Sequence, residues 1–272
     1  MKLGFFTMPI HPLGKDWRTC LREDREAFIL ADELGFTEGY VGEHATDKAE
    51  NITSCALFIA TLADATKNIR LGTGTVNMPN AHPAAVASQI AMLDHLLDGR
   101  FNFGISPGGL LSDAEAFGTL DKDRTAMFVE AIDMVLDIWK SEPPYNLKGE
   151  HWTVSTEKTM IPEIGQGILP KPLQTPHPPI IVTAVALFQK ASSPLRRAAG
   201  ILFRQIFSCP NGWPVIGQSM RRVASRAADR LTRLNGAWPR ACSLQMILTL
   251  PESMRSALKA PTVITTIKSS LR

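Results

Sequence analysis

The sequence has little that could cross-link or anchor the chain. Its 272 residues include only four cysteines, which are widely separated, form no CxxC pair and have no histidine at zinc-finger spacing. This pattern argues against a disulfide framework and against a structural metal site. No apolar run approaches membrane-spanning length, and the opening MKLGFFTMPIHPLG has too short an apolar stretch for a secretion signal. We therefore expect a soluble, cytoplasmic protein that binds no metal and no membrane.

Acidic residues are almost absent from the last third of the chain. Residues 1–186 hold 15 Lys and Arg against 24 Asp and Glu, whereas residues 187–272 hold 14 against 2. A basic terminal segment usually indicates nucleic acid or an anionic membrane as its partner. A nucleic-acid-binding tail is therefore one alternative for residues 187–272, and it predicts salt-dependent binding that is lost when they are removed.

The first two thirds of the chain alternate strand-like and helix-like segments, and no strand is followed by GxGxxG. Buried-strand patterns occur at residues 2–8, 38–44, 69–76 and 100–106. Helical patterns follow them at residues 16–36, 53–67, 82–99 and 123–140. Strands that alternate with helices in this way form a parallel sheet covered on both faces. Four units in about a hundred residues would become eight in about 250, which predicts an α/β fold of the (β/α)8 TIM barrel type.

Three further elements are expected after the fourth strand. Ser112 and Glu115 have the spacing of a capping box at the start of a helix. Residues 143–154 have the pattern of a turn and hairpin, and residues 178–185, PPIIVTAV, that of another buried strand.

In a barrel the chemistry lies on the loops that follow the strands, and the second strand is followed by His44. A histidine there could act as an acid or base near a bound substrate. It could equally be a loop histidine that only forms a structural hydrogen bond, and the sequence leaves both readings open. The neighbouring Glu43 lacks the further ligands that a metal would need, and His82 and His95 fit structural positions in or beside helices.

The fourth strand leads into Gly104-Ile105-Ser106-Pro107-Gly108, which matches the GxSxG pattern of serine hydrolases. In that mechanism the backbone N–H after the serine stabilises the oxyanion, and Pro107 has no N–H. A serine hydrolase that uses Ser106 is therefore a weaker alternative. A glycine-rich turn that lets the backbone approach a flat or anionic ligand explains the pattern better, with an ordinary tight turn as the competing explanation.

The third strand ends in TGTVNMPN, where small residues precede Asn77 and Pro79. Small residues at a strand end would leave room for a planar ring at the barrel mouth. Simple packing inside the barrel explains the same pattern.

Several stretches together resemble one family, the luciferase-like flavin-dependent monooxygenases. They are FTMPIHP, GFTEGYVGEH, NIRLGTGTVNMP, HPAAVASQIAMLDHLLDGRFNFGISPGG and PPIIVTAVA, which fall within residues 1–186. Within the family they are most similar to the limonene 1,2-monooxygenase branch. The combination is specific, although each motif alone is common.

The resemblance implies a (β/α)8 barrel that takes reduced flavin (FMNH2 or FADH2) from a separate flavin reductase and uses O2 to insert one oxygen atom into an organic substrate. It implies His44 as the active-site histidine. It also implies flavin-ring contacts at Thr75, Asn77, Ser106, Gly108 and Gly109, and phosphate contacts near Thr183 and Val185. We expect a small apolar substrate such as the monoterpene limonene, and homo-oligomers among intact family members. A dehydrogenase of the same superfamily that uses F420 is the alternative with the same fold.

The resemblance stops near residue 186, where LFQKASSPLRR replaces the family's phosphate-loop pattern. Back-translation of RQIFSCPNGWP, read two nucleotides out of frame, gives ANFLMPKWLA, and DRLTRLNGAWP similarly gives PADPAKWRVA. Both resemble the family's own C-terminal third, as does a shifted reading of PTVITTIKSSL. Because most bases of the shifted codons are fixed by the first reading, agreement over three segments argues against chance. We therefore predict a frameshift between about Ala186 and Lys190.

This hypothesis makes residues 187–272 a frameshifted tail with no domain of its own and no nucleic-acid site. Residues 1–186 would then be a partial barrel, because about three of its eight units would be missing. Such a barrel could not close, and its last strand would leave an unpaired edge. We expect an aggregation-prone chain with little activity.

Overall fold

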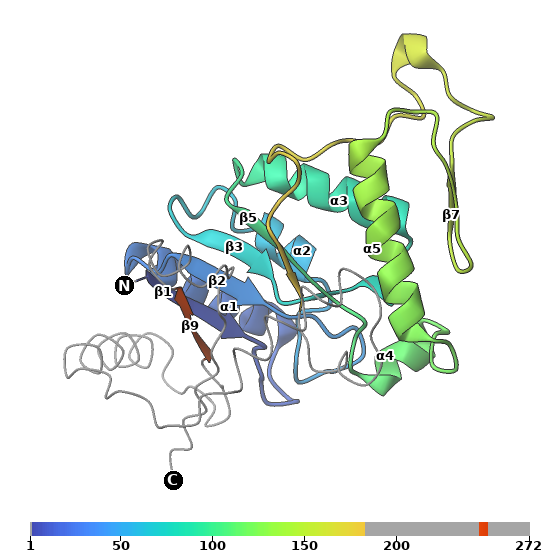
Figure 1. Ribbon diagram of the computed structural model, residues 1–272. Helices are drawn as coiled ribbons and strands as arrows, with labels where there is room; N and C mark the ends of the chain where they lie inside the picture. The colour runs from blue at the N-terminus through green and yellow to red at the C-terminus, as the bar shows by residue number, and fades with distance from the viewer. Residues whose placement is uncertain (1, 183–244, 250–272) are drawn as a thin grey trace, which may run out of the picture.

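A computed structural model describes residues 2–182 and 245–249, and its centre is a mostly parallel sheet (Figure 1). Its strands are β1 (Lys2–Thr7), β2 (Glu38–Val41), β3 (Arg70–Thr73), β4 (Val76–Asn77), β5 (Phe101–Ser106), β8 (Ile180–Val182) and β9 (Gln245–Thr249). The order across the sheet is β4-β5-β3-β2-β1-β9, and β8 pairs with β5. All these pairs are parallel except that of β1 with β9.

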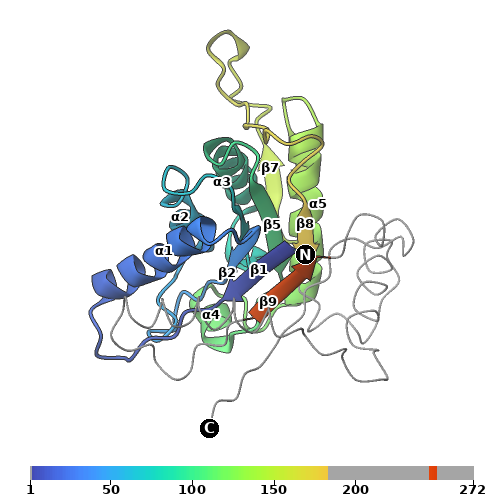
Figure 2. The same cartoon turned by 90° about the vertical axis from the view of Figure 1, so that its left-hand side faces the viewer.

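Helices connect the strands in the order that the sequence predicts. They are α1 (Trp17–Glu33), α2 (Cys55–Ala60), α3 (Pro83–Leu96), α4 (Leu111–Ala116) and α5 (Arg124–Lys140), with short 3-10 turns η1 (Met78–Asn80) and η2 (Pro162–Ile164). Helices α1, α2 and α3 lie along one side of the sheet (Figure 2), and α3 packs against α5. The α/β class and the parallel sheet are thus confirmed.

The core lies between the sheet and this helical layer. Every residue of β5 is buried, as expected for a strand covered on both faces. Aromatic rings join the layers: the ring centroids of Phe5 and Phe28 are 4.7 Å apart, and those of Phe28 and Phe58 are 5.5 Å apart. Strand β1 and helices α1 and α2 therefore share one continuous apolar core.

The helix predicted over residues 53–67 is shorter in the structure. Helix α2 ends at Ala60, and turns follow it up to the third strand. The Arg100 guanidinium donates hydrogen bonds to the carbonyl oxygens of Ala63 and Thr66. Those carbonyls are therefore held by a side chain from a distant segment rather than by a continuing helix.

The capping box predicted at Ser112 and Glu115 is wrong. Helix α4 begins at Leu111, and its N-cap, Leu110, forms no side-chain capping bond. Ser112 lies within the helix, and its hydroxyl is 2.7 Å from the Thr46 hydroxyl, within hydrogen-bonding distance. Ser112 therefore contacts a residue that is distant in the chain and does not cap its own helix.

The predicted hairpin is confirmed as strands β6 (Asn146–Lys148) and β7 (Thr153–Ser155), which pair antiparallel. The Glu130 carboxylate on α5 accepts hydrogen bonds from the backbone N–H groups of Glu150, His151 and Trp152. A single helix side chain thus fixes the loop of the hairpin.

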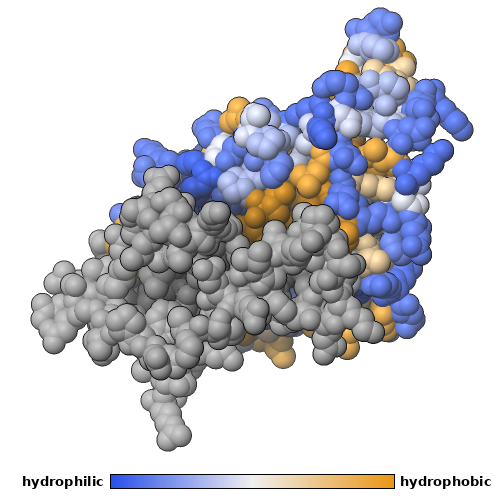
Figure 3. Space-filling view, viewed as in Figure 1, coloured by the Kyte–Doolittle hydropathy of each residue, from blue (hydrophilic) through white to orange (hydrophobic). Residues whose placement is uncertain are grey.

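The sheet does not close on itself within the described part of the chain. Strand β8 pairs with β5 and with no other described strand, and β9 runs antiparallel to β1. In a (β/α)8 barrel all eight strands are parallel, so β9 is not in the orientation of a barrel strand. On the face shown in Figure 3, hydrophobic side chains gather in the middle of the molecule and hydrophilic ones lie toward its upper edge.

Candidate functional site

The carboxyl ends of the parallel strands bring three loops together. Strand β2 leads into Glu43 and His44, β3 leads through Thr75 into β4, and β5 ends at Ser106. Strand β4 pairs with β5 so that Asn77 lies beside Ser106. The loops that the sequence singled out therefore meet at one edge of the sheet, which is where ligands bind in α/β proteins.

A buried hydrogen-bond network joins two of these loops. The Thr75 hydroxyl donates to Ser106 Oγ across 2.7 Å, and the Ser106 hydroxyl donates to Asn77 Oδ1 across 3.0 Å. The backbone N–H of Gly108 also donates to Ser106 Oγ, across 3.1 Å. Thr75, Asn77 and Ser106 are all buried, so the network forms a rigid, neutral surface at the end of the sheet.

This network leaves Ser106 poorly suited to act as a nucleophile. Its proton is directed at an amide oxygen, and its oxygen accepts from a hydroxyl and a backbone N–H. No histidine is among its hydrogen-bond partners in the described residues, whereas an activated serine needs an adjacent base. With Pro107 next in the chain, the geometry argues against a serine hydrolase.

Glu43 holds Asn77 in place by accepting hydrogen bonds at its side chain and at its backbone. Its Oε1 accepts from Asn77 N and its Oε2 from Cys55 N, each across 3.0 Å, and its backbone oxygen accepts from Asn77 Nδ2 across 3.3 Å. The thiol of Cys55 also donates to Oε2 of Glu43, across 3.0 Å. Burial raises the pKa of the Glu43 carboxyl, although the hydrogen bonds from Cys55 and Asn77 oppose this shift.

His44 lies beside a carboxylate from α4. Its Nδ1 is 3.3 Å from Oδ2 of Asp113, and the other carboxylate oxygen accepts from Thr46 N across 2.9 Å and from the Thr46 hydroxyl. Burial alone would raise the pKa of Asp113, but hydrogen bonds from Thr46 and His44 outweigh it and lower that pKa. An ionised Asp113 that fixes one nitrogen of a histidine is a common arrangement for acid–base chemistry.

No pattern in the sequence points to Asp113. It lies 69 residues after His44, and the only local signal near it, the apparent capping box, concerned its neighbours. His82 and His95 lie in structural positions, as expected. His82 accepts from Ala84 N at the start of α3, and His95 Nε2 lies 3.0 Å from the carbonyl oxygen of Lys171.

The glycine turn after β5 is open. Gly108 has φ +76, a left-handed conformation that favours glycine, and a Cβ at Gly109 would meet nothing within 4 Å. Arg124 at the start of α5 donates to the carbonyl oxygen of Gly108 and so anchors the turn. Of the other proposed contacts, Thr183 and Val185 lie outside the described residues.

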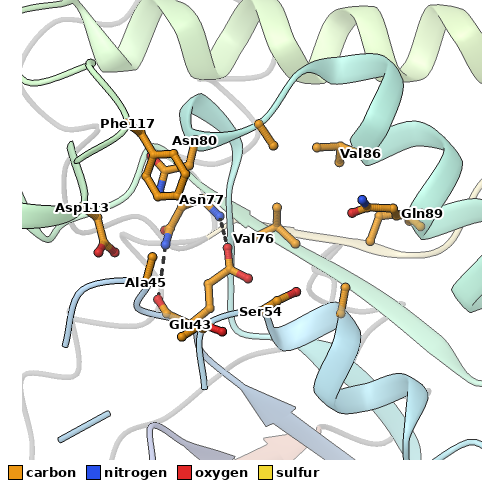
Figure 4. Close-up of a pocket in the computed structure, with 14 residues that line it drawn as sticks. Glu43, Ala45, Ser54, Val76, Asn77, Asn80, Val86, Gln89, Asp113 and Phe117 are labelled. Atoms are coloured by element: carbon orange, nitrogen blue, oxygen red, sulfur yellow. Dashed lines mark hydrogen bonds between the residues drawn. The ribbon is translucent and has the colours of Figure 1, made fainter. Parts of the chain in front are cut away.

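A cavity of about 160 Å³ lies behind these loops, between the segment after β2, the start of α2, α3 and α4. Figure 4 shows Asn77 turned toward Glu43, with Asp113 and Phe117 on one side of the cavity and Val86 and Gln89 on the other. Sites for cofactors usually exceed roughly 300 Å³, so this cavity is too small for a flavin. It adjoins the candidate site rather than forming it.

Two further findings concern the described part of the chain only. Residues 2–182 and 245–249 hold no group of three or more His, Cys, Asp or Glu side chains arranged to bind a metal ion. Within the same residues, no helix combines the length and the apolar character needed to span a bilayer.

Together these features define a class of protein: an α/β chain with a parallel sheet, whose strand-end loops form a rigid neutral surface beside one histidine–carboxylate pair. The chain matches the luciferase-like monooxygenase family over residues 1–244 and belongs to that family. The barrel type predicted from the sequence is thereby confirmed at the level of the family.

Three curated relatives are similar over about half of this chain. The 4-hydroxyprotoasukamycin monooxygenase of Streptomyces nodosus subsp. asukaensis is 39% identical, over 53% of this chain and 39% of the relative. Limonene 1,2-monooxygenase of Rhodococcus erythropolis is 37% identical, over 48% of this chain and 34% of the relative. The oxygenase component of flavin-dependent trigonelline monooxygenase from Acinetobacter baylyi is 34% identical, over 57% and 41%. This chain thus spans well under half the length of these relatives.

Solved structures show the same fold. The oxygenating constituent of 3,6-diketocamphane monooxygenase from Pseudomonas putida, in complex with FMN, has a TM-score of 0.64 at 27% identity, over 88% of this chain and 64% of that one. An F420-dependent secondary alcohol dehydrogenase, with a TM-score of 0.53 and 18% identity over 88% of this chain and 66% of that one, is similar in fold alone.

Proposed function

We propose that the chain is the oxygenase component of a two-component monooxygenase. It would use reduced flavin and O2 to insert one oxygen atom into a small apolar substrate, a monoterpene such as limonene. The observation that carries the proposal is the meeting of the Thr75, Asn77 and Ser106 network with the His44–Asp113 pair at one sheet edge, in a chain of this family. The similarity to limonene 1,2-monooxygenase supports the substrate class.

The residues present fit a flavin ring. Gly108 and Gly109 carry no side chain, and the space beside Gly109 is open among the described residues. The hydroxyl and amide groups of Thr75, Asn77 and Ser106 are hydrogen-bonded to one another. A flavin ring that lies on these residues would therefore meet a neutral surface. A bound reduced flavin would supply the electrons that activate O2. The similarity to a structure in complex with FMN favours FMN over FAD.

The protein's own part in this chemistry would be to hold the ring, exclude water and move a proton. Asp113 orients His44 through Nδ1, which leaves Nε2 as the nitrogen that exchanges a proton with the reacting groups. We assign the phosphate of the flavin to the segment that contains Thr183 and Val185. A flavin reductase would be the partner, as expected for a protein similar to an oxygenase component. The homo-oligomeric state and the cytoplasmic location stay predictions.

We also propose that residues 187–272 are translated out of frame, although the family match continues to residue 244. The curated relatives align with only about half of this chain, which supports the proposal. The antiparallel pairing of β9 with β1 supports this, because a barrel of this family type would place a parallel strand at that edge. The net positive charge of the segment is then a result of the shifted codons and not a nucleic-acid site.

The experiment compares the chain with the product of a gene in which one base is inserted or deleted near the codons for Ala186 to Lys190. Each protein is supplied with a flavin reductase, NADH, FMN, limonene and ¹⁸O2. We expect the repaired protein to give a product with one ¹⁸O atom and the original chain to give little. A repaired protein that turns over substrate with F420 and consumes no O2 would instead be a dehydrogenase, and equal activity of both proteins would contradict the frameshift.

A further inference from the structure

The imidazole of His44 lies between two carboxylates, not one. Its Nδ1 is 3.3 Å from Asp113 Oδ2, and its Nε2 is 3.2 Å from Glu50 Oε2. The side chains of His44 and Glu50 are only 18% and 21% exposed, and that of Asp113 is 4% exposed. Charges this well shielded from water interact strongly with one another.

The position of the first proton follows from Asp113. Its Oδ1 already accepts from the Thr46 backbone N–H and hydroxyl, and its pKa is lowered, so it is an ionised acceptor. The nitrogen that faces Oδ2 must therefore carry a hydrogen, which places a proton on Nδ1 of His44.

The second nitrogen then creates a conflict. If His44 carried a proton on Nδ1 alone and Glu50 were ionised, Nε2 and Oε2 would face each other with lone pairs only. Two such acceptors 3.2 Å apart repel unless one of them carries a proton. Oε2 of Glu50 is buried and has no hydrogen-bond partner among the described groups, so its contact with Nε2 is a close charge contact and not an aligned hydrogen bond.

The loop that carries Glu50 is firmly held. Oδ1 of Asp47 accepts from the N–H groups of Ala49 and Glu50 across 2.8 and 3.3 Å, and the indole of Trp17 donates to Asn51 O across 2.9 Å. His44 N donates to Ile52 O across 3.0 Å, which folds the loop back onto the histidine itself. The position of Glu50 is therefore built into the fold.

The charges that face Glu50 act in opposite directions. Burial raises the pKa of its carboxyl, His44 lowers it, and the carboxylates of Asp47 and Asp113 raise it. When the Glu50 carboxyl is ionised, its negative charge 3.2 Å from Nε2 favours the form of the ring that carries a proton on that nitrogen.

We propose that the Glu50 carboxyl group, by its charge, favours a proton on Nε2 of His44, and that Glu50 is a positioning residue which keeps this proton available at Nε2. The inference rests on the proposed function for its use, because Nε2 is the nitrogen assigned to proton exchange. It goes beyond that function in naming Glu50 as the group that favours the proton on Nε2 before it is transferred.

The test follows the protons of His44 directly. The full chain is labelled with ¹⁵N-histidine, and the ring nitrogens of His44, assigned by their loss in His44→Gln, are followed by NMR as the pH rises. We expect Nε2 of the unaltered protein to stay protonated to a higher pH than in Glu50→Gln, because the amide lacks the negative charge. Glu142→Gln, which removes an exposed carboxylate of a surface ion pair, is the matched control and should change nothing.

Equal midpoints in the unaltered protein and Glu50→Gln would overturn the proposal. So would a His44 ring that carries only the Nδ1 proton throughout the pH range. If Glu50→Gln fails to fold, Glu50→Asp, whose shorter side chain withdraws the carboxylate from Nε2, should give a smaller shift in the same direction. The NMR result does not depend on turnover, so a proton favoured on Nε2 by Glu50 without oxygenation would count against the proposed function alone.

Discussion

The Asp113 carboxylate lies 3.3 Å from Nδ1 of His44, although 69 residues separate the two in the chain. Thr46 completes the arrangement, because its backbone N–H and hydroxyl hold the other oxygen of Asp113. The loop after β2 and the first turn of α4 are thus joined by one buried carboxylate, and this contact fixes Nδ1 as the nitrogen of His44 that faces α4.

Replacing Asp113 by Asn should keep the shape of this joint but lose its charge. The amide no longer fixes a proton on Nδ1, so we expect kcat of the repaired oxygenase to fall by about 100-fold with little change in flavin affinity. Turnover with a flavin reductase and limonene measures the effect, and the exposed Asp121→Asn serves as the control. A 100-fold loss of flavin affinity at unchanged kcat would show that Asp113 acts in binding instead.

The same carboxylate should make stability depend on pH in acid. The pKa of Asp113 is lowered in the folded chain, so the unfolded chain binds the proton more readily. Its stabilising effect is therefore present above its ordinary pKa of 3.8 and is lost as the pH falls through the lowered value. Urea unfolding of the unaltered chain and Asp113→Asn between pH 3 and 7 should give free energies that converge in acid. If the two free energies kept a constant difference over this pH range, the lowered pKa of Asp113 would be contradicted.

Ser106 should prove to be structural. Ser106→Ala leaves the Asn77 Oδ1 and the Gly108 N–H without their partner, which should cost about 1–3 kcal/mol of unfolding free energy. Ser88, whose hydroxyl donates to Ala84 O within its own helix and to no other described residue, provides a control variant, Ser88→Ala, with a smaller loss. Intact-mass measurement after treatment with a fluorophosphonate should show no adduct, and an adduct on Ser106 would revive the serine hydrolase.

Gly104 should tolerate no side chain. A Cβ there would lie 1.8 Å from the carbonyl oxygen of Thr73, a backbone atom of the neighbouring strand that has no room to move. We expect Gly104→Ala to lower the unfolding free energy by about 3 kcal/mol or more, at the upper end of overpacking effects. Gly14→Ala is the matched control, because a Cβ at Gly14 meets nothing within 4 Å. Equal urea midpoints for the two variants would show that β3 and β5 are not packed as described.

Glu43 should have the opposite pH effect to Asp113. Burial raises its pKa above the ordinary 4.5, so the folded chain holds a proton that the unfolded chain releases first. Its contribution to stability is therefore fully present below pH 4.5 and declines as the pH rises toward the raised pKa. Glu43→Gln cannot titrate, and the slope of its unfolding free energy above pH 4.5 should be less negative than that of the unaltered chain. An unchanged slope would show that the proton which the folded chain holds above pH 4.5 is not on Glu43.

Much of the fold could be predicted from the chain because its signals are local. Asp16 caps α1 as expected, with its carboxylate accepting from Thr19 N, and Gly35 follows the helix with φ +80. The alternation of apolar strands and helices predicted the parallel sheet, and the loops after its strands predicted where His44, Asn77 and Ser106 would meet. Where the prediction failed, a distant group was the cause: Arg100 takes carbonyls that α2 would have used.

The sequence by itself determined the class of fold, the family and the three loops of the site, because strand periodicity, caps and turns are properties of short segments. Only the tertiary structure decided the partners of His44. Asp113 comes from a helix 69 residues away, and Glu50 is directed back toward the ring by bonds to Trp17 and Ile52. The protonation of a half-buried histidine depends on the distance to charges and on their exclusion from water, and neither quantity exists until the chain is folded.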